Sequence, residues 1–169
     1  METQSTPARR RLPVKRRSRT IRLGDGYWPA GFPWLARARA RLIGARLRIA
    51  MRRGWVVVLV GRRGTGKTVL LERATPGQII DKSSLFPGIV DTQRPQLKLA
   101  EIPDGPFSID EPMALEESSL RDAIEALRGR GFAVAFQARR HVRHLGLEQE
   151  LNERHRCLWV ELGPRDTLQ

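Results

Sequence analysis

The chain has 169 residues, which is enough for one domain and a tail but not for two large domains. Its net charge of +13 lies entirely in residues 1–54, where 14 Arg and one Lys stand against two acidic residues, while residues 55–169 hold 16 basic and 16 acidic residues. The single cysteine, Cys157, excludes an internal disulfide, and no run of about 18 apolar residues is present to span a bilayer. We therefore expect one folded core in the cytoplasm. A peripheral position at the inner face of the membrane is the alternative.

Residues 1–26 are rich in arginine and contain two prolines but show no apolar period. Such a segment cannot bury enough apolar surface to fold alone, so we expect a disordered basic arm. Because each cation that neutralises a phosphate releases a counterion, this charge indicates a polyanion partner. The arginines of the arm assigned to that role are Arg9, Arg10, Arg11, Arg16 and Arg17. A solvated tail without a partner is the alternative.

Residues 27–54 combine an aromatic, turn-rich stretch with a helix expected from Trp34 to Arg53. Apolar residues spaced three and four apart predict the face that packs on the core: Leu35, Ala38, Leu42, Ala45 and Ile49. Arginines flank this stripe, and four of them extend the predicted polyanion surface: Arg37, Arg41, Arg48 and Arg52. In the alternative reading these arginines only extend into water from a helix that packs on the core.

Residues 55–74 read as a strand, a glycine-rich loop and a helix. The loop has the sequence Gly61-Arg62-Arg63-Gly64-Thr65-Gly66-Lys67-Thr68. Its glycines let successive backbone N–H groups point at phosphate oxygens at a helix N-terminus. The Lys67 ammonium would reach the β and γ phosphates and the Thr68 hydroxyl would bind Mg²⁺. The loop predicts a site for a nucleoside triphosphate, ATP with Mg²⁺.

After the loop, short apolar strands are expected at residues 78–81, 107–109, 132–136 and 157–162, with helical segments after Ser119 and around 141–154. Together with the first strand they make five strands that alternate with helices. This pattern predicts an α/β fold in three layers with a mostly parallel sheet, formed by residues 55–169.

Polar residues at the ends of two of these strands complete the predicted site. Asp110 is expected to join Thr68 in the Mg²⁺ shell, and Glu111 to orient and deprotonate the attacking water. Gln137 is a candidate to bind the γ-phosphate or that water. An arginine could neutralise transition-state charge in a neighbouring subunit, and the candidates are Arg139, Arg140, Arg154 and Arg156. His141 and His144 are expected at the surface.

Gly61 to Thr68, the Asp110-Glu111 pair and Gln137 together resemble the additional-strand catalytic-glutamate branch of P-loop ATPases, which includes AAA+ and RecA-like proteins. Within this branch the chain looks most like a minimal version of the FtsK/HerA and VirD4-type ATPases that pump DNA. The resemblance implies the strand order 5-1-4-3-2, with Asp110 as the Walker B aspartate and Glu111 as the catalytic glutamate.

Two functions follow from these features. The first is an ATPase that acts on or with DNA through residues 1–54, as a homo-oligomer, in transfer, partition or packaging of a mobile element such as a plasmid or phage. The second is a nucleotide-dependent adaptor whose basic N-terminus docks on a partner ATPase, an acidic protein or an anionic membrane.

Overall fold

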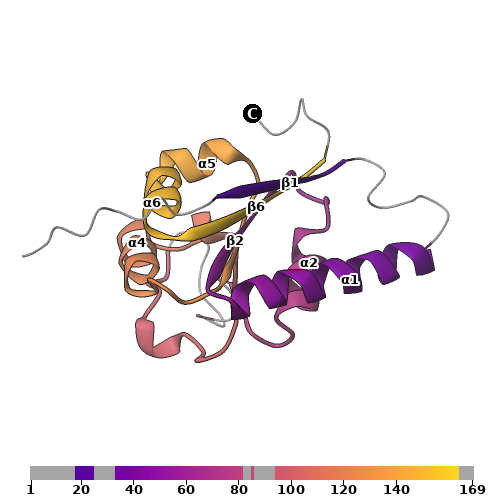
Figure 1. The fold of residues 1–169 in the computed structure, drawn as a ribbon. Coiled ribbons are helices and arrows are strands. Elements are labelled where there is room, and N and C mark those ends of the chain that lie inside the picture. The colour runs from indigo at the N-terminus through magenta and orange to yellow at the C-terminus, as the bar shows by residue number, and fades with distance from the viewer. Residues whose placement is uncertain (1–17, 25–32, 82–84, 86–93, 164–169) are drawn as a thin grey trace, which may run out of the picture.

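A computed structural model describes residues 18–24, 33–81, 85 and 94–163. It contains one sheet of six strands, all paired in parallel in the order β1-β6-β2-β5-β4-β3 (Figure 1). The strands are β1 (Arg19–Leu23), β2 (Trp55–Gly61), β3 (Ile79–Ile80), β4 (Ser108–Asp110), β5 (Ala133–Phe136) and β6 (Arg156–Leu162). The helices are α1 (Pro33–Arg52), α2 (Lys67–Ala74), α4 (Glu117–Ala126), α5 (Arg139–His144) and α6 (Leu147–Arg154), with short 3-10 turns η2 (Leu99–Glu101) and η3 (Pro112–Ala114).

Helices cover both faces of the sheet, as Figure 1 shows. One face carries α1 and α2, which pack on Val57 and Leu59 of β2. The opposite face carries α4, α5 and α6, which share a core with Val56, Val58 and Val60. All five of these residues have no exposed surface, which explains why β2 reads as a continuous apolar run and not as an alternating one. The predicted three-layer α/β fold is confirmed.

The predicted order of five strands is also confirmed, since β6-β2-β5-β4-β3 is the order 5-1-4-3-2 in the numbering of the prediction. The structure adds a sixth strand, β1, which lies beside β6 at the edge of the sheet. Residues 19–23 therefore do not belong to a disordered arm, and the prediction is wrong there. Residues 1–17, with Arg9, Arg10, Arg11, Arg16 and Arg17, lie outside the described residues.

Strand β1 is held by its neighbours and not by burial of its own side chains, four of which are exposed. The Arg22 guanidinium donates to the Glu161 carboxylate at 2.9 Å, and the Leu23 carbonyl accepts from Gly163 N–H at 3.1 Å. The Arg19 guanidinium lies over the Trp55 ring, 5.8 Å from its centroid. A strand made by pairing along one edge leaves only a faint apolar signal in the sequence.

Helix α1 packs on the core through a different face from the predicted one. Its buried residues are Ala40, Gly44, Leu47 and Met51, whereas Leu42 and Ile49 of the predicted stripe are 54% and 50% exposed. The reason is the close approach of α2: a Cβ on Gly44 would lie 2.5 Å from Arg73 Cβ. The Arg48 guanidinium adds hydrogen bonds of 2.7 and 2.9 Å to the carbonyls of Ala74 and Arg73. The close approach at Gly44 and the hydrogen bonds of Arg48, together with burial of Leu47 and Met51, determine which face is buried.

Among the described residues, no helix has the length and apolar character needed to cross a membrane.

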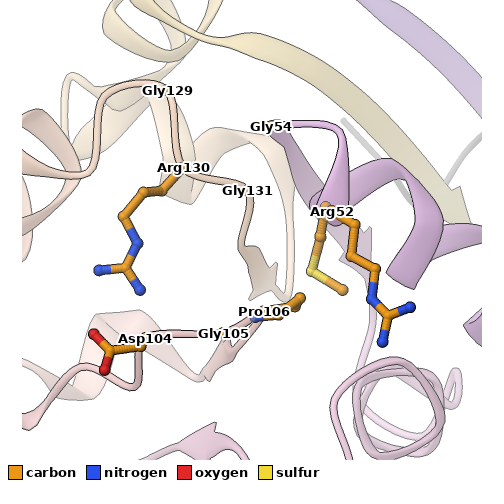
Figure 2. Close-up of a pocket in the computed structure, with 9 residues that line it drawn as sticks. Arg52, Gly54, Asp104, Gly105, Pro106, Gly129, Arg130 and Gly131 are labelled. Carbon is orange, nitrogen blue, oxygen red and sulfur yellow. The ribbon is translucent and has the colours of Figure 1, made fainter.

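Four glycines lie at the edge of the sheet where β2, β4 and β5 begin. Gly54, Gly105, Gly129 and Gly131 line a cavity of about 280 Å³ together with the end of α1 (Figure 2). A Cβ on Gly131 would lie 1.8 Å from the Met51 carbonyl oxygen, so the backbone of α1 touches the backbone of the segment just before β5. Arg52 and Arg130 lie on either side of this cavity in Figure 2.

We expect Gly131→Ala to lower the free energy of unfolding by about 2 kcal/mol or more, because the methyl group would collide with backbone and not with a side chain that can move. Gly105→Ala is the matched control: it lines the same cavity, has no atom within 4 Å of the added Cβ, and should change stability by less than about 0.5 kcal/mol. Urea unfolding of both variants measures the difference. Equal stability of the two variants would contradict the close backbone contact.

Cys157 generates a prediction about alkaline pH. Its thiol is fully buried, donates to the Leu151 carbonyl at 3.1 Å, and burial raises its pKa from 9.0 to about 12. Because the pKa is raised in the folded state, the stabilisation is complete below about pH 9 and is lost as pH rises toward 12. The wild-type protein should therefore lose up to about 1.4 kcal/mol more per pH unit than Cys157→Ala above pH 9. Parallel pH slopes for the two proteins in urea unfolding would refute this.

Candidate functional site

The carboxyl ends of β2, β4 and β5 meet at one edge of the sheet, opposite the glycine-lined cavity. Each strand delivers one part of the predicted site there: β2 leads into the loop of residues 61–68, β4 ends at Asp110, and Gln137 follows β5. They surround a cavity of about 350 Å³, lined by Arg63, Gly64, Gly66, Lys67, Thr68, Val69, Asp110, Glu111 and Gln137. The structure thus brings together most of the residues that the sequence singled out, from segments up to 74 positions apart.

The conformation of the loop requires its glycines. Gly64 and Gly66 have φ of 80° and 85°, in the left-handed region that other residues rarely occupy. At Gly61 the restriction is space, since a Cβ would lie 2.6 Å from Thr65 Oγ1 and 2.8 Å from Leu162 Cβ. Gly66 is also the residue before α2, so the free N–H groups of the first turn of that helix face the cavity end of the loop.

Lys67 is held inside the loop. Its Nζ donates to the carbonyls of Gly61 at 2.6 Å and Arg62 at 2.9 Å, and the residue is only 8% exposed. Burial lowers the pKa of the ammonium, and the negative charges of Asp110 and Glu111 act in the opposite direction. A phosphate in the cavity would supply the negative charge that two carbonyl groups supply only in part.

Thr68 and Asp110 bring a hydroxyl and a carboxylate together across the cavity. Thr68 Oγ1 donates to Asp110 Oδ2 at 2.7 Å, and the other carboxylate oxygen accepts from Glu111 N–H at 3.0 Å. Asp110 is 7% exposed, so its position is fixed by packing as well. Hydroxyl and carboxylate oxygens are the hard ligands that Mg²⁺ prefers. These two side chains therefore fit a Mg²⁺ ion that keeps water and phosphate oxygens as its other ligands.

Glu111 has an unusual backbone. Its φ of 48° and ψ of 54° place it in the left-handed region, and it is the single residue other than glycine with positive φ among those described. Such a conformation costs about 1 kcal/mol or more and tends to occur at functional positions. The strand β4 ends here, and the turn η3 starts with a bond from Ala114 N–H to the Glu111 carbonyl at 2.8 Å. The side chain is exposed and borders the cavity.

A second cavity of about 330 Å³ lies beside the first and shares Lys67, Glu111 and Gln137 with it. Its other lining residues are mostly apolar and come from η3 and the end of β5. His141 also lines it, although this residue was expected at the surface. Its buried Nδ1 has no hydrogen-bond partner in the described part of the chain. The sequence offered no local signal for this, because α5 begins only at Arg139 and Ala138 before it is extended, so Gln137 and His141 do not share a helix.

The four candidate arginines have different surroundings. The Arg139 guanidinium pairs with Glu148 at 2.6 Å and Glu161 at 3.4 Å and lies over the Trp159 ring, whereas Arg140 is exposed. Arg154 and Arg156 lie where β6 begins, at the edge opposite the loop. Glu148 illustrates how firmly Arg139 is engaged: burial raises its pKa, but hydrogen bonds from Arg143 and Arg139 outweigh burial and lower it overall. A role for any of the four in a neighbouring subunit stays a prediction.

The backbone of Glu111 gives a direct test of strain at this site. We expect Glu111→Gly to be about 1 kcal/mol more stable than Glu111→Ala, because both remove an exposed side chain but only glycine accepts φ of 48° freely. Equilibrium unfolding in urea measures the difference. If Glu111→Ala is as stable as Glu111→Gly, the backbone of residue 111 does not have the left-handed conformation.

Comparison with known proteins gives one informative similarity. The chain is 34% identical over 112 residues to the zinc import ATP-binding protein ZnuC of Marinobacter nauticus, and the match covers 63% of this chain and 42% of that protein. The chain thus spans less than half the length of this relative. No family model matches the chain, and no solved structure matches it. The all-parallel sheet, the loop between β2 and α2, and this similarity together give the chain the fold of a P-loop NTPase.

Proposed function

We propose that the protein is a Mg²⁺-dependent ATP hydrolase. The observation that carries this proposal is the hydrogen bond between Thr68 and Asp110, which places a hydroxyl and a buried carboxylate beside the glycine-rich loop and Lys67. The similarity to a protein named as ATP-binding supports the choice of nucleotide. Because the chain covers less than half of that relative, the import of zinc is not carried over.

Each group of the site has a task in hydrolysis. Backbone N–H groups of residues 64–68 and the Lys67 ammonium bind the β and γ phosphates. Thr68 and Asp110 would hold Mg²⁺, which would neutralise charge on the phosphate oxygens. Glu111 orients a water molecule and accepts its proton as the water oxygen bonds to the γ phosphorus, while the bond from that phosphorus to the β–γ bridging oxygen breaks. The products are ADP and inorganic phosphate.

The second cavity suits the water that this reaction needs. It borders Glu111 and Gln137, and most of its other lining residues are apolar, which limits how many water molecules can approach the γ-phosphate position. The Gln137 amide and the Glu111 carboxylate border this cavity and could hold a water molecule there. We assign Gln137 to positioning the water, in agreement with its place after β5.

The first test replaces the proposed base. We expect Glu111→Gln to lower the kcat for ATP hydrolysis about 100-fold or more while ATP still binds, because the amide keeps the size of the side chain but cannot accept the proton. Lys67→Ala should instead weaken binding of ATP itself. Phosphate release and equilibrium binding of a fluorescent ATP analogue separate the two effects.

Glu117→Gln is the matched control, since Glu117 is a partly exposed glutamate on α4 that pairs with Arg121. It should hydrolyse ATP at the wild-type rate. Hydrolysis by Glu111→Gln at the wild-type rate would remove Glu111 from the mechanism. Tight ATP binding without hydrolysis in the wild-type protein would favour the nucleotide-dependent adaptor instead.

The assignment to a DNA-pumping branch, a role on mobile elements and a homo-oligomeric state remain proposals that rest on sequence. For DNA, the argument is the positive charge of residues 1–54. The structure qualifies this argument at two arginines: Arg48 is engaged with carbonyls of α2, and Arg22 with Glu161. A DNA-stimulated rate of hydrolysis that falls steeply with salt would support the proposal, and a rate independent of DNA would remove it.

A further inference from the structure

The solvent-facing side of α1 carries an apolar stripe. Trp34, Leu42 and Ile49 are 67%, 54% and 50% exposed, and Ala38 and Ala45 lie between them and are exposed as well. Their spacing of three and four residues puts them on one line along the helix. The opposite face is buried against α2 and the sheet, so this stripe lies on the outside of the domain, where Figure 1 shows α1.

Arginines border the stripe on both sides. At 100° per residue, Arg37, Arg41 and Arg52 fall along one margin and Arg46 and Arg53 along the other. All five are exposed, and α1 contains no acidic residue. Within the part of the chain that the structure describes, no ion pair involves any of these five. The face is therefore apolar at its centre and cationic at its edges along a 20-residue helix.

We propose that this face of α1 binds the surface of an anionic lipid bilayer, with the helix lying parallel to the membrane plane. A helix with an apolar line between two cationic margins buries the apolar side chains at the level of the acyl boundary while the cations remain among the headgroups. Arginine fits those margins, because its long apolar stem lies along the lipid and its guanidinium binds a lipid phosphate through two hydrogen bonds. Trp34 near the start of the helix adds an indole, a group that favours the interface.

The apolar centre is the reason to choose a membrane over nucleic acid. A helix that binds DNA through phosphates needs only its cations, and it gains nothing from leucine and isoleucine on the same line. On a bilayer these side chains leave water and contribute to binding in proportion to their apolar area. The same distinction makes the partner testable, because the apolar residues can be changed without any change in charge.

Membrane binding and the proposed hydrolysis use separate surfaces. No residue of α1 lines either cavity at the loop. The buried side of α1 packs on α2, the helix that begins with Lys67 and Thr68, whereas the apolar stripe lies on the other side of α1. The inference therefore stands or falls independently of ATP hydrolysis.

The test is flotation of the full chain with vesicles of phosphatidylcholine alone and of phosphatidylcholine mixed with phosphatidylglycerol. We expect the protein to float with the anionic vesicles and not with the neutral ones. The double variant Leu42→Ser, Ile49→Ser should bind anionic vesicles on the order of 100-fold more weakly, about tenfold for each side chain withdrawn from the bilayer. Both residues are exposed, so the variant should fold, and the thermal transition of the purified protein checks that it does.

Controls separate this face from general effects of charge and surface polarity. Leu99→Ser removes an equally exposed leucine, 54% like Leu42, from η2, which adjoins the core on the other face of the sheet. This variant should bind vesicles like the wild type, as should Glu111→Gln. The double variant Arg41→Gln, Arg52→Gln should weaken binding to anionic vesicles. The variant Lys98→Gln should bind them like the wild type.

Three results would overturn the proposal. The first is equal flotation of the wild type and the Leu42, Ile49 double variant, which would assign vesicle binding to charge alone. The second is no flotation with anionic vesicles. The third is a pattern of DNA binding: duplex DNA binds the wild type, binds the Arg41, Arg52 variant more weakly, and binds the Leu42, Ile49 variant as well as the wild type. If vesicles also compete poorly with the DNA, the face binds nucleic acid.

Discussion

Strand β2 is buried on both faces and paired along both edges, and the site depends on this position. Val56 to Val60 have no exposed surface, β6 pairs with all seven residues of the strand and β5 with four of them. A strand held in this way ends at a fixed point, so the loop that follows it starts from a rigid base. Because every neighbour is parallel, the strands on one side of β2 also end at this edge and bring Asp110 and Gln137 to the loop. Packing in the interior thus sets the distance between Thr68 and Asp110.

Around this base the polar groups compensate one another. Lys67 is buried and binds two loop carbonyls, while Asp110 is buried and accepts from Thr68 and from the backbone of Glu111. A buried charge without such partners would destabilise the fold. Phosphate could replace the carbonyl partners of Lys67, and Mg²⁺ could replace the hydrogen bond between Thr68 and Asp110. The site can therefore bind these groups without losing the partners that its buried charges need. Glu111 adds a strained backbone conformation beside them.

Sequence reasoning identified the features that strong local signals encode. The loop octapeptide, the buried β2 run and the Asp110-Glu111 pair after a short strand each combine residue type with context, and the alternation of strands with helices predicted a parallel sheet. The order of its five strands was implied only by the resemblance to P-loop ATPases. It failed where tertiary contacts decide. Strand β1 exists through pairing with β6, which no local pattern reports. The buried face of α1 was misjudged because Gly44 allows α2 to approach closely, which leaves Leu42 and Ile49 facing solvent. His141 was misplaced for the same reason, since only the fold turns it toward Glu111 and Gln137.

The most direct test of the central claim is a crystal structure of the full chain with Mn²⁺ and a non-hydrolysable ATP analogue, with the anomalous signal used to locate the metal. The account predicts the metal beside Thr68 Oγ1 and the Asp110 carboxylate, with the terminal phosphates over residues 64–68. It also predicts that the Lys67 ammonium turns from the Gly61 and Arg62 carbonyls to a phosphate oxygen. A nucleotide bound elsewhere on the molecule, or an anomalous peak away from Thr68 and Asp110, would contradict it.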